Sequence, residues 1–415
     1  MYICAVYNLQ TMDILTRKEY AAQVDSWLGK EVIIVLTGQR RVGKSYVLKD
    51  FVQRHQQDEN VNIIYIDKEK RQFSFIANQE QLGKYIDEHF VKGKNNYILV
   101  DEIQEIEGWE HVVRSFRTEE NTDIIITGSN SKMLSSELST LLAGRYEEIR
   151  IQGLSYLEFL MFHGLEDNEA SLTAYLNYGG MPGLRVIGLR EEEHIWEYLH
   201  SVFDTVILKD VVERHNIRNI PFLKNLITYL ADTIGKINSA TSINKYMKSL
   251  QQTISTNVIL DYANYYAEAY LIDLVNRYDI HGRRLFDNNR KTFFGDVGLR
   301  NMIVGSTRDS DIEKVIENVV YLHLKRLGFQ VYIGQLQASE IDFVCTKPSG
   351  LRVYVQASYL IANEETRARE FGNLRKINDN YPKFVISMTP LVSRNDDNGI
   401  IHLHLRRFLT EGLGI

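Results

Sequence analysis

The fold of this chain is decided by the run Gly38-Gln39-Arg40-Arg41-Val42-Gly43-Lys44-Ser45. It fits the phosphate-binding pattern G-x-x-x-x-G-K-[ST] at every fixed position. The apolar residues 32–36 precede the run and the helix-compatible residues 46–53 follow it, so strand, glycine loop and helix come in the required order. The sequence therefore predicts that this loop binds the phosphates of a nucleotide.

Each residue type in the loop has a physical reason to be there. Gly38 and Gly43 allow the backbone to take positive φ and to approach a phosphate closely. Successive N–H groups then form a nest for an anion, and the following helix adds the positive end of its dipole. Lys44 is expected to reach the β- and γ-phosphates and the Ser45 hydroxyl to hold Mg²⁺. We predict that all eight loop residues and Tyr46 bind the nucleotide.

A second motif lies at residues 97–102, where the apolar run YILV ends in Asp101 and Glu102. A continuous apolar run is typical of a buried parallel strand, and ligands of such sheets bind beyond the carboxyl ends of the strands. Asp101 is therefore expected to face the magnesium through water. Glu102 is expected to orient and polarise the attacking water. The alternative is a solvated Asp-Glu pair after a core strand.

A third apolar run, residues 123–127, ends in small polar residues. Thr127, Ser129 and Asn130 are candidates for sensing the γ-phosphate or positioning water; the alternative is that they cap a helix predicted at residues 131–142. Arg145 follows soon after. It is predicted to neutralise transition-state charge in its own subunit or in a neighbour's, unless it is an ordinary solvated arginine.

Composition limits the class of protein. A chain of 415 residues is too long for one core, so two or three domains are expected. The 44% hydrophobic and 25% charged residues are ordinary for a globular protein, and the net charge of −6 does not by itself indicate nucleic acid. Only Cys4 and Cys345 occur, so neither a disulfide framework nor a cysteine-based zinc site is predicted, and a cytoplasmic location is expected. No stretch of 18 apolar residues predicts a membrane span.

Hydrophobic periodicity divides the chain into four predicted domains. Strands at 32–37, 61–66, 97–101, 123–127 and 146–151 alternate with helices, which predicts an α/β fold, a P-loop NTPase parallel sheet, within residues 1–152. A helical, lid-like region is expected at 153–215, where Ser155 and Glu158 form a capping box. A winged-helix-like domain is expected at 216–310 and an α/β domain at 311–415.

The winged-helix-like prediction rests on three helical periods followed by a hairpin. The loop at 279–291 contains Arg283, Arg284, Arg290 and Lys291. A basic wing of this kind suits DNA phosphates. The alternative is a protein-interaction or packing module with a solvated basic loop.

The last domain has the order of helices and strands of metal-dependent nucleases. Glu317 lies in a predicted helix and Asp342 enters a strand. Gln356 and Ser358 stand where a second carboxylate and a lysine are needed. An amide is a poor Mg²⁺ ligand and serine carries no charge, so we expect a nuclease-like fold without nuclease activity.

These motifs together resemble a prokaryotic family of ATP-binding proteins that joins an AAA-type ATPase core to a C-terminal DUF4143 region. The chain is also similar to archaeal-type ATPases with restriction-endonuclease-like, PD-(D/E)XK tails. Besides the three nucleotide motifs, the resemblance rests on residues 143–145, 154–159, 178–182, Lys209-Asp210, 295–300, Glu317-Asn318 and 340–343. It covers nearly the whole chain.

The resemblance implies ATP as the nucleotide, beside the Mg²⁺ expected from the motifs. The first hypothesis is a Mg²⁺-dependent ATPase that couples nucleotide state to conformational change and to binding of a protein or DNA partner, with oligomerisation through Arg145. A second is a nucleotide-gated switch with little turnover. A third is an ATPase-coupled, metal-dependent nuclease. Each keeps Lys44, Ser45 and Asp101 in the same roles.

Overall fold

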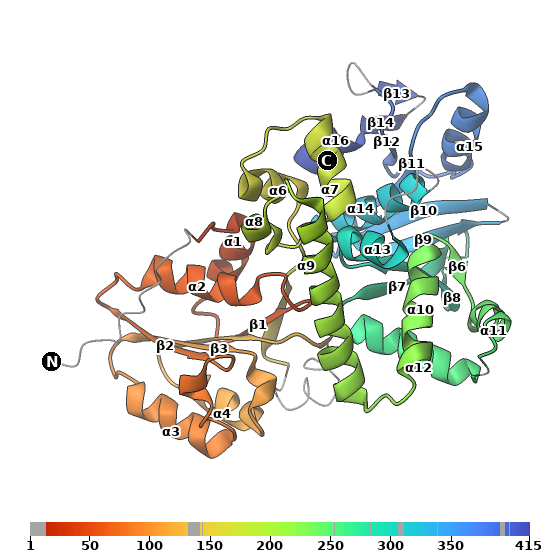
Figure 1. Ribbon diagram of the computed structural model, residues 1–415. Coiled ribbons are helices and arrows are strands. Elements are labelled where there is room, and N and C mark those ends of the chain that lie inside the picture. The colour runs from red at the N-terminus through yellow and green to blue at the C-terminus, as the bar shows by residue number, and fades with distance from the viewer. Residues whose placement is uncertain are drawn as a thin grey trace. The chain divides into compact units, whose positions relative to one another are not determined.

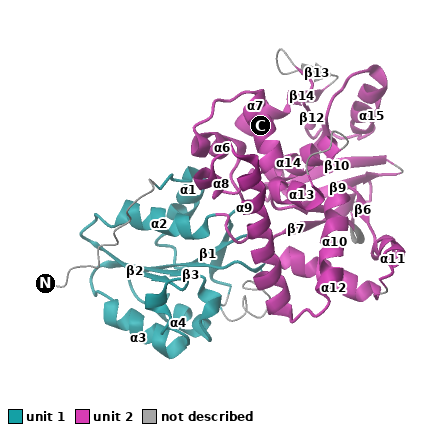
Figure 2. Ribbon diagram, viewed as in Figure 1, with its two compact units in different colours: residues 1–38, 43–151 teal, residues 39–42, 152–415 magenta. Residues whose placement is uncertain are grey.

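The computed structural model describes residues 14–131, 142, 144–252, 254–282, 284–305, 311–337, 339–390, 395–397 and 399–415. The helix predicted at 131–142, Ala143 and Arg283 therefore lie wholly or mostly outside the described residues. The chain divides into two compact units (Figure 2). Unit 1 comprises Met1–Gly38 and Gly43–Ile151, and unit 2 comprises Gln39–Val42 and Gln152–Ile415.

Unit 1 alternates strands and helices along the chain, as the periodicity predicts (Figure 1). Its elements are α1 (Lys18–Trp27), β1 (Ile33–Thr37), α2 (Lys44–His55), β2 (Val61–Asp67), η1 (Arg71–Phe73), α3 (Gln79–His89), β3 (Asn95–Asp101), η2 (Ile103–Glu105), α4 (Trp109–Phe116), β4 (Thr122–Thr127) and β5 (Tyr146–Arg150).

The strands of unit 1 form a parallel sheet in the order β2-β3-β4-β1-β5. Helices α1 and α2 pack on one face of the sheet, and α3 and α4 pack on the other (Figure 1). Because both faces are covered, the strands are buried apolar runs; Ile33, Val35, Ile98 and Val100 contribute to the core on the α3–α4 side. The predicted P-loop NTPase sheet is confirmed, and β4 lies between the strand of the glycine loop and the strand of the two carboxylates.

Unit 2 begins with helices and ends with mixed α and β structure. Its elements are α6 (Tyr156–His163), α7 (Glu169–Tyr178), α8 (Leu184–Ile187), α9 (Glu192–Thr205), the π-helix η4 (Val206–Glu213), α10 (Ile220–Asp232), β6 (Ile237–Asn238), α11 (Ala240–Ser249), α12 (Thr256–Glu268), β7 (Ile272–Asp279), β8 (Arg284–Phe294), α13 (Val297–Val304), α14 (Ile312–Arg326), β9 (Gln330–Leu336), β10 (Ser339–Thr346), β11 (Arg352–Ser358), α15 (Glu364–Arg375), β12 (Lys383–Ser387), β13 (Asn395–Asp397), β14 (Ile400–His404) and α16 (Leu405–Glu411).

The strands of unit 2 belong to one sheet, in the order β13-β14-β12-β11-β10-β9-β7-β8-β6. Strands β7 and β9 pair in parallel, so the sheet runs across the boundary predicted at residue 310. One face carries the larger apolar core, to which α14 and α16 contribute, and the other packs against Phe371 and Leu374 of α15. The predicted boundary at 152–153 lies within a residue or two of the division between the units, and the boundaries at 215 and 310 stay predictions.

The helical part of unit 2 is joined to its sheet by two glycine-containing motifs. Ser155 and Glu158 form the predicted capping box at the start of α6. The turn after α7 is tied to the start of α13, because the Gly180 N–H donates to Asp296 Oδ2 at 2.7 Å. A Cβ on Gly179, which has φ +73°, would collide with the same carboxylate. The motifs at 178–182 and 295–300 therefore form one structural junction.

The predicted basic loop is corrected by the structure. Most of residues 279–291 form strand rather than loop, since β8 begins at Arg284. Lys291 is 2% exposed and bonds to carboxylates, because its side chain points into the domain. Lys291 is thus not part of a solvated basic surface. The three helices and hairpin do follow the order of a winged helix, and that assignment stays a prediction.

Within the described part of the chain, no helix combines the length and the apolar character needed to cross a bilayer.

Candidate nucleotide site

The glycine loop has the backbone that an anion nest requires. Gly38 has φ +136°, Arg41 φ +71° and Gly43 φ +98°. Gly43 is the N-cap residue of α2. Because glycine has no side chain, it offers no side-chain cap to the first N–H groups of that helix. Amides at a helix N-terminus, next to positive-φ glycines, form a site suited to phosphate.

Lys44 is held in place at the start of α2. Its side chain is 4% exposed, and its Nζ donates to the Gly38 carbonyl at 3.1 Å. The same ammonium lies 3.8 Å from Glu102 Oε1. A buried cation across the mouth of the loop suits the β- and γ-phosphates.

Asp101 ends β3 at the same edge of the sheet. Its Oδ1 accepts a hydrogen bond of 2.6 Å from Thr127 Oγ1, and Ser45 also donates to it. Burial raises the pKa of Asp101 above its ordinary value; the hydrogen bonds from Thr127 and Ser45 oppose that rise. A cation at this position would favour the carboxylate, so the Ser45 hydroxyl and the Asp101 carboxylate fit Mg²⁺ as adjacent oxygen ligands.

Thr127 connects the two carboxylate residues. Its hydroxyl donates to Asp101 and accepts the Glu102 N–H at 2.9 Å, and its side chain is fully buried. With both functions engaged, the Thr127 hydroxyl orients these residues and has no hydrogen left for a phosphate. The sensor role stays a prediction for the next polar residues, Ser129 and Asn130.

Glu102 has an unusual backbone, with φ +55°. Its carboxylate accepts a hydrogen bond from the Gln104 amide and lies near Lys44. A positive φ at a non-glycine residue is uncommon and often marks a functional position. Here it turns the Glu102 side chain back toward the glycine loop.

Asp67 is a residue of this edge that the motifs do not reveal. It ends β2, pairs in register with Asp101 and is 4% exposed. The sequence signal for Asp67 is that it is the polar residue at the end of an apolar strand. Among the described residues, no group of His, Cys, Asp and Glu has the geometry of an all-protein metal cage.

The apex of the glycine loop, Gln39–Val42, groups with unit 2. Within that unit, Arg40 donates from Nε and Nη2 to the two oxygens of Asp210, at 2.9 Å each. Asp210 lies in the π-helix and is 1% exposed. A Cβ on Gly295 would come within 3.2 Å of Gln39 Oε1. Asp210 thus holds Arg40, and the lack of a side chain at Gly295 leaves space for Gln39, which sequence patterns alone do not reveal.

The remaining predicted site residues differ in how far they are buried. Asn130 and Ser129 are buried beyond β4, and the Gly128 N–H donates to Leu36 O, which ties this segment to the loop strand. Tyr46 is 55% exposed on α2. Arg145 is exposed and precedes β5, with its carbonyl accepting the Ile33 N–H.

The position of Arg145 rules out one of its predicted roles. Ile33 begins β1, whereas the glycine loop follows the other end of that strand. The two ends are separated by four residue steps, or about 13 Å. That exceeds the reach of an arginine, so Arg145 does not serve the site of its own subunit. A role in a neighbouring copy stays a prediction.

The nuclease-like residues are brought together in unit 2. Asp342 Oδ2 accepts the Ala357 N–H at 2.8 Å, and Gln356 Oε1 accepts the Asp342 N–H at 3.3 Å. Ser358 is buried, and its hydroxyl has no hydrogen-bond partner among the described residues. Gln356 therefore serves the backbone of β10, which an amide does as well as a carboxylate.

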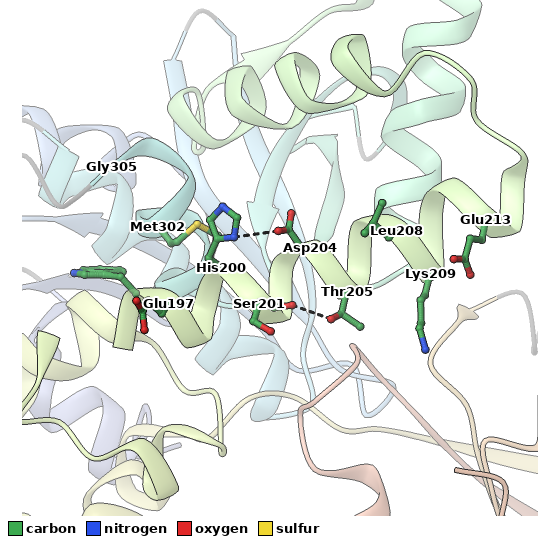
Figure 3. A pocket seen from close by; sticks show the side chains of 11 residues that line it. Glu197, His200, Ser201, Asp204, Thr205, Leu208, Lys209, Glu213, Met302 and Gly305 are labelled. Atoms are coloured by element: carbon green, nitrogen blue, oxygen red, sulfur yellow. Dashed lines mark hydrogen bonds and ion pairs between the residues drawn. The ribbon is translucent and has the colours of Figure 1, made fainter. Parts of the chain in front are cut away.

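A separate hollow of about 980 Å³ lies along α9 and η4 (Figure 3). Its lining includes Glu197, Ser201, Leu208 and Lys209, and His200 Nδ1 lies 3.1 Å from Asp204 Oδ2. No residue of the predicted nucleotide motifs lines it. We assign it no ligand.

Comparisons with known proteins agree with this geometry. Residues 30–160 match the family described as AAA domain, and residues 169–310 match a domain of unknown function, DUF8612. The expected DUF4143 region is thus replaced by a different domain. A Walker-type ATPase of Pyrococcus abyssi is similar in structure, with a TM-score of 0.52 and 16% identity, covering 70% of this chain and 96% of that one. At this identity the likeness concerns the fold alone.

Two relatives are similar along most of their length. An uncharacterized protein of Haemophilus influenzae is 33% identical over 382 residues, which are 90% of this chain and 93% of the relative. An uncharacterized protein of Methanocaldococcus jannaschii is 31% identical over 360 residues, covering 83% and 78% of the two chains. The chain therefore belongs to the family of these two proteins and carries an AAA-type, P-loop ATPase-like domain at residues 30–160.

Proposed function

We propose that this protein is a Mg²⁺-dependent ATPase whose nucleotide state controls the binding of a protein or DNA partner. The observation that carries the proposal is the convergence of Lys44, Asp101 and Glu102 beside a positive-φ glycine loop. The phosphates of ATP lie in the nest of loop amides, and Lys44 balances their charge. Ser45 and Asp101 hold Mg²⁺, which when bound withdraws charge from the β- and γ-phosphates.

Glu102 is the residue proposed to orient water for attack on the γ-phosphate. Its carboxylate lies 3.8 Å from Lys44, the residue that marks the phosphate position. Asn130, buried after β4, is proposed to assist in placing that water. Hydrolysis then needs little covalent chemistry from the protein, because positioning and charge stabilisation supply most of the rate in phosphoryl transfer.

The test is steady-state hydrolysis of Mg²⁺-ATP by the full chain. Glu102→Gln is expected to lower kcat by about 10²–10⁴-fold while ATP still binds. Lys44→Ala is expected to lose binding, and Lys49→Ala, on the same helix, serves as the control. If wild type and Glu102→Gln hydrolyse ATP at the same background rate, the ATPase proposal fails. Calorimetry with Mg²⁺-ATP and Mg²⁺-GTP tests nucleotide binding and base preference separately.

A second candidate function is a nucleotide-gated switch with little turnover. The observation that favours it is the hydrogen bond from Gln104 to Glu102, which engages the carboxylate needed for water activation. ATP would then be held without rapid hydrolysis. The deciding result is a change of partner affinity between ATP and ADP with negligible kcat.

The partner is proposed to be retained best in the ATP-bound state. Co-purification with wild type and Glu102→Gln in ATP identifies it, because a protein that cannot hydrolyse ATP should hold its partner longest. Assembly through Arg145 is part of the same proposal. If a neighbouring copy uses this arginine, Arg145→Ala should lower ATPase activity. The loss should grow as the protein concentration rises.

A further inference from the structure

A buried lysine lies among the acidic residues of the nuclease-like region. Lys291 of β8 is 2% exposed. Its Nζ is 2.9 Å from Glu317 Oε1 on α14 and 2.7 Å from Glu340 Oε1 on β10. These are the lengths of charge-assisted hydrogen bonds. Three secondary-structure elements thus meet at one ammonium group.

Asp342 belongs to the same cluster. It follows Glu340 on β10 by two residues and is 8% exposed. Both Glu317 and Lys291 act on its carboxyl group. Glu370 of α15 is also close enough to act on it, but Glu370 already has Arg369 at 2.7 Å. Lys291 is therefore the cation that bonds directly to Glu317 and Glu340, and together with Arg369 it acts on the Asp342 carboxyl group.

The backbone approaches the Glu317 carboxylate closely at Gly235. Gly235 lies against Glu317 with φ +69°, and a Cβ there would collide with Glu317 Oε2. The Gly235 N–H bonds to Thr292 O, next to Lys291. The absence of a Cβ at Gly235 thus lets the backbone lie directly against the Glu317 carboxylate.

Carboxylate oxygens that converge on one point can serve as ligands of a divalent cation. Here the Lys291 ammonium of the same chain occupies the place where the carboxylates converge. Burial raises the pKa of Asp342 well above its ordinary value, and Glu317 adds to the rise. Among the described residues, no group of three or more His, Cys, Asp or Glu side chains is arranged to hold a metal ion.

We infer that the Lys291 ammonium is the resident cation of this acidic cluster, in the place that a divalent metal would otherwise take. The cluster fastens β8 to α14 and β10, and this region neither binds a divalent ion at Asp342 nor cleaves DNA. The inference is independent of ATP binding, because all of these residues lie in unit 2.

The first test is titration of Mn²⁺ alone into the full-length wild type and into Asp342→Asn, without nucleotide. The two proteins are expected to bind the same number of Mn²⁺ ions, since any ion bound elsewhere is common to both. Linear and single-stranded DNA with Mn²⁺ should be cleaved by neither. An Mn²⁺ site or a cleavage activity of the wild type that Asp342→Asn lacks would overturn the assignment.

The second test removes the ammonium. Lys291→Met is expected to lower the thermal midpoint in EDTA and to gain one Mn²⁺ site that raises the midpoint by about 3 °C or more. The gain should vanish in Lys291→Met with Asp342→Asn. Lys314→Met, which removes a lysine bonded to Asp311, is the matched control and should gain no site. A folded Lys291→Met protein with no added Mn²⁺ site contradicts the inference; if it does not fold, the first test decides alone.

Discussion

Arg40, at the apex of the glycine loop, is joined to Asp210 of the π-helix by two parallel hydrogen bonds of 2.9 Å. The arginine side chain is 14% exposed and the aspartate 1%. A bidentate pair of this kind fixes orientation as well as distance. An eight-residue π-helix is also rare, and such segments are frequent at functional sites.

Replacing Asp210 with Asn should destabilise the protein and weaken ATP binding. The change removes the carboxylate charge from a bidentate pair whose aspartate is 1% exposed, at a cost of about 1.5–3 kcal/mol. The loop loses the contact that holds its apex, so the Kd for ATP should rise. Urea unfolding and calorimetry measure the two effects. Glu213→Gln, an exposed carboxylate on the same π-helix, should change neither quantity; equal effects of the two variants would contradict the role of the pair.

Gln104→Ala should raise the rate of ATP hydrolysis by about 3- to 10-fold. That factor corresponds to the loss of one hydrogen bond that contributes about 1 kcal/mol. The Gln104 amide engages the Glu102 carboxylate, and its loss frees that group to meet water. The Kd for ATP should stay constant, and Glu105→Gln is the neighbouring control. A fall in kcat would instead mean that Gln104 holds Glu102 in its productive orientation.

Thr127→Val should weaken the Mg²⁺ dependence of ATP binding. Valine has the same shape but leaves Asp101 and the Glu102 N–H without the hydroxyl that joins them, at a cost of about 1–3 kcal/mol in stability. Titrating Mg²⁺ at fixed ATP measures the effect. Thr122→Val, at the half-exposed start of the same strand, should leave both the titration and the unfolding curve unchanged.

Stability should fall with acid because of His402. Burial lowers the pKa of His402 to about 4, and Arg367 and His404 add to the effect, whereas an unfolded histidine has a pKa near 6.5. The unfolded chain therefore takes up the proton first as the pH falls. The contribution is present above pH 6.5 and is lost as the pH falls toward 4.

Between pH 7 and pH 5 this loss should reach about 2 kcal/mol. Urea unfolding at both pH values measures it, with His402→Gln as the test variant. The glutamine keeps a polar group for Ser387, which lies 2.8 Å from His402 Nε2. The variant should lose less stability over this range than the wild type, whereas exposed His111→Gln should follow the wild type. A variant curve parallel to the wild-type curve would contradict the prediction.

Sequence motifs indicated which residues gather at the edge of unit 1 where we propose that the nucleotide binds, because each motif is local in sequence. Gly38, Gly43, Lys44 and Ser45 are consecutive or nearly so, and their backbone follows from glycine freedom and the start of a helix. Asp101 and Thr127 end apolar strands, and parallel strands bring such ends to one edge. Asp67 was missed because a single aspartate after a strand is a weak signal without the strand order.

The prediction that Lys291 lies in a solvated basic loop was wrong, because burial is not a local property of the sequence. A run of arginines and a lysine near a hairpin reads as a solvated basic loop. Lys291 instead lies on a strand whose side chains alternate between faces, and its face meets Glu317 and Glu340. Arg145 is a similar case, since its distance from the glycine loop is set by the length of β1.

By itself, the sequence determined that a glycine loop, two carboxylates and a polar strand end would meet in a parallel α/β sheet. Spacing suffices there, because each feature is encoded within a few residues. Only the tertiary structure decided that Arg40 is bound by Asp210 and that Lys291 is bonded to Glu317 and Glu340. The contacts of Arg40 with Asp210 and of Lys291 with Glu317 join residues 170 and 26 positions apart, and pairing at such separations depends on the packing of whole elements.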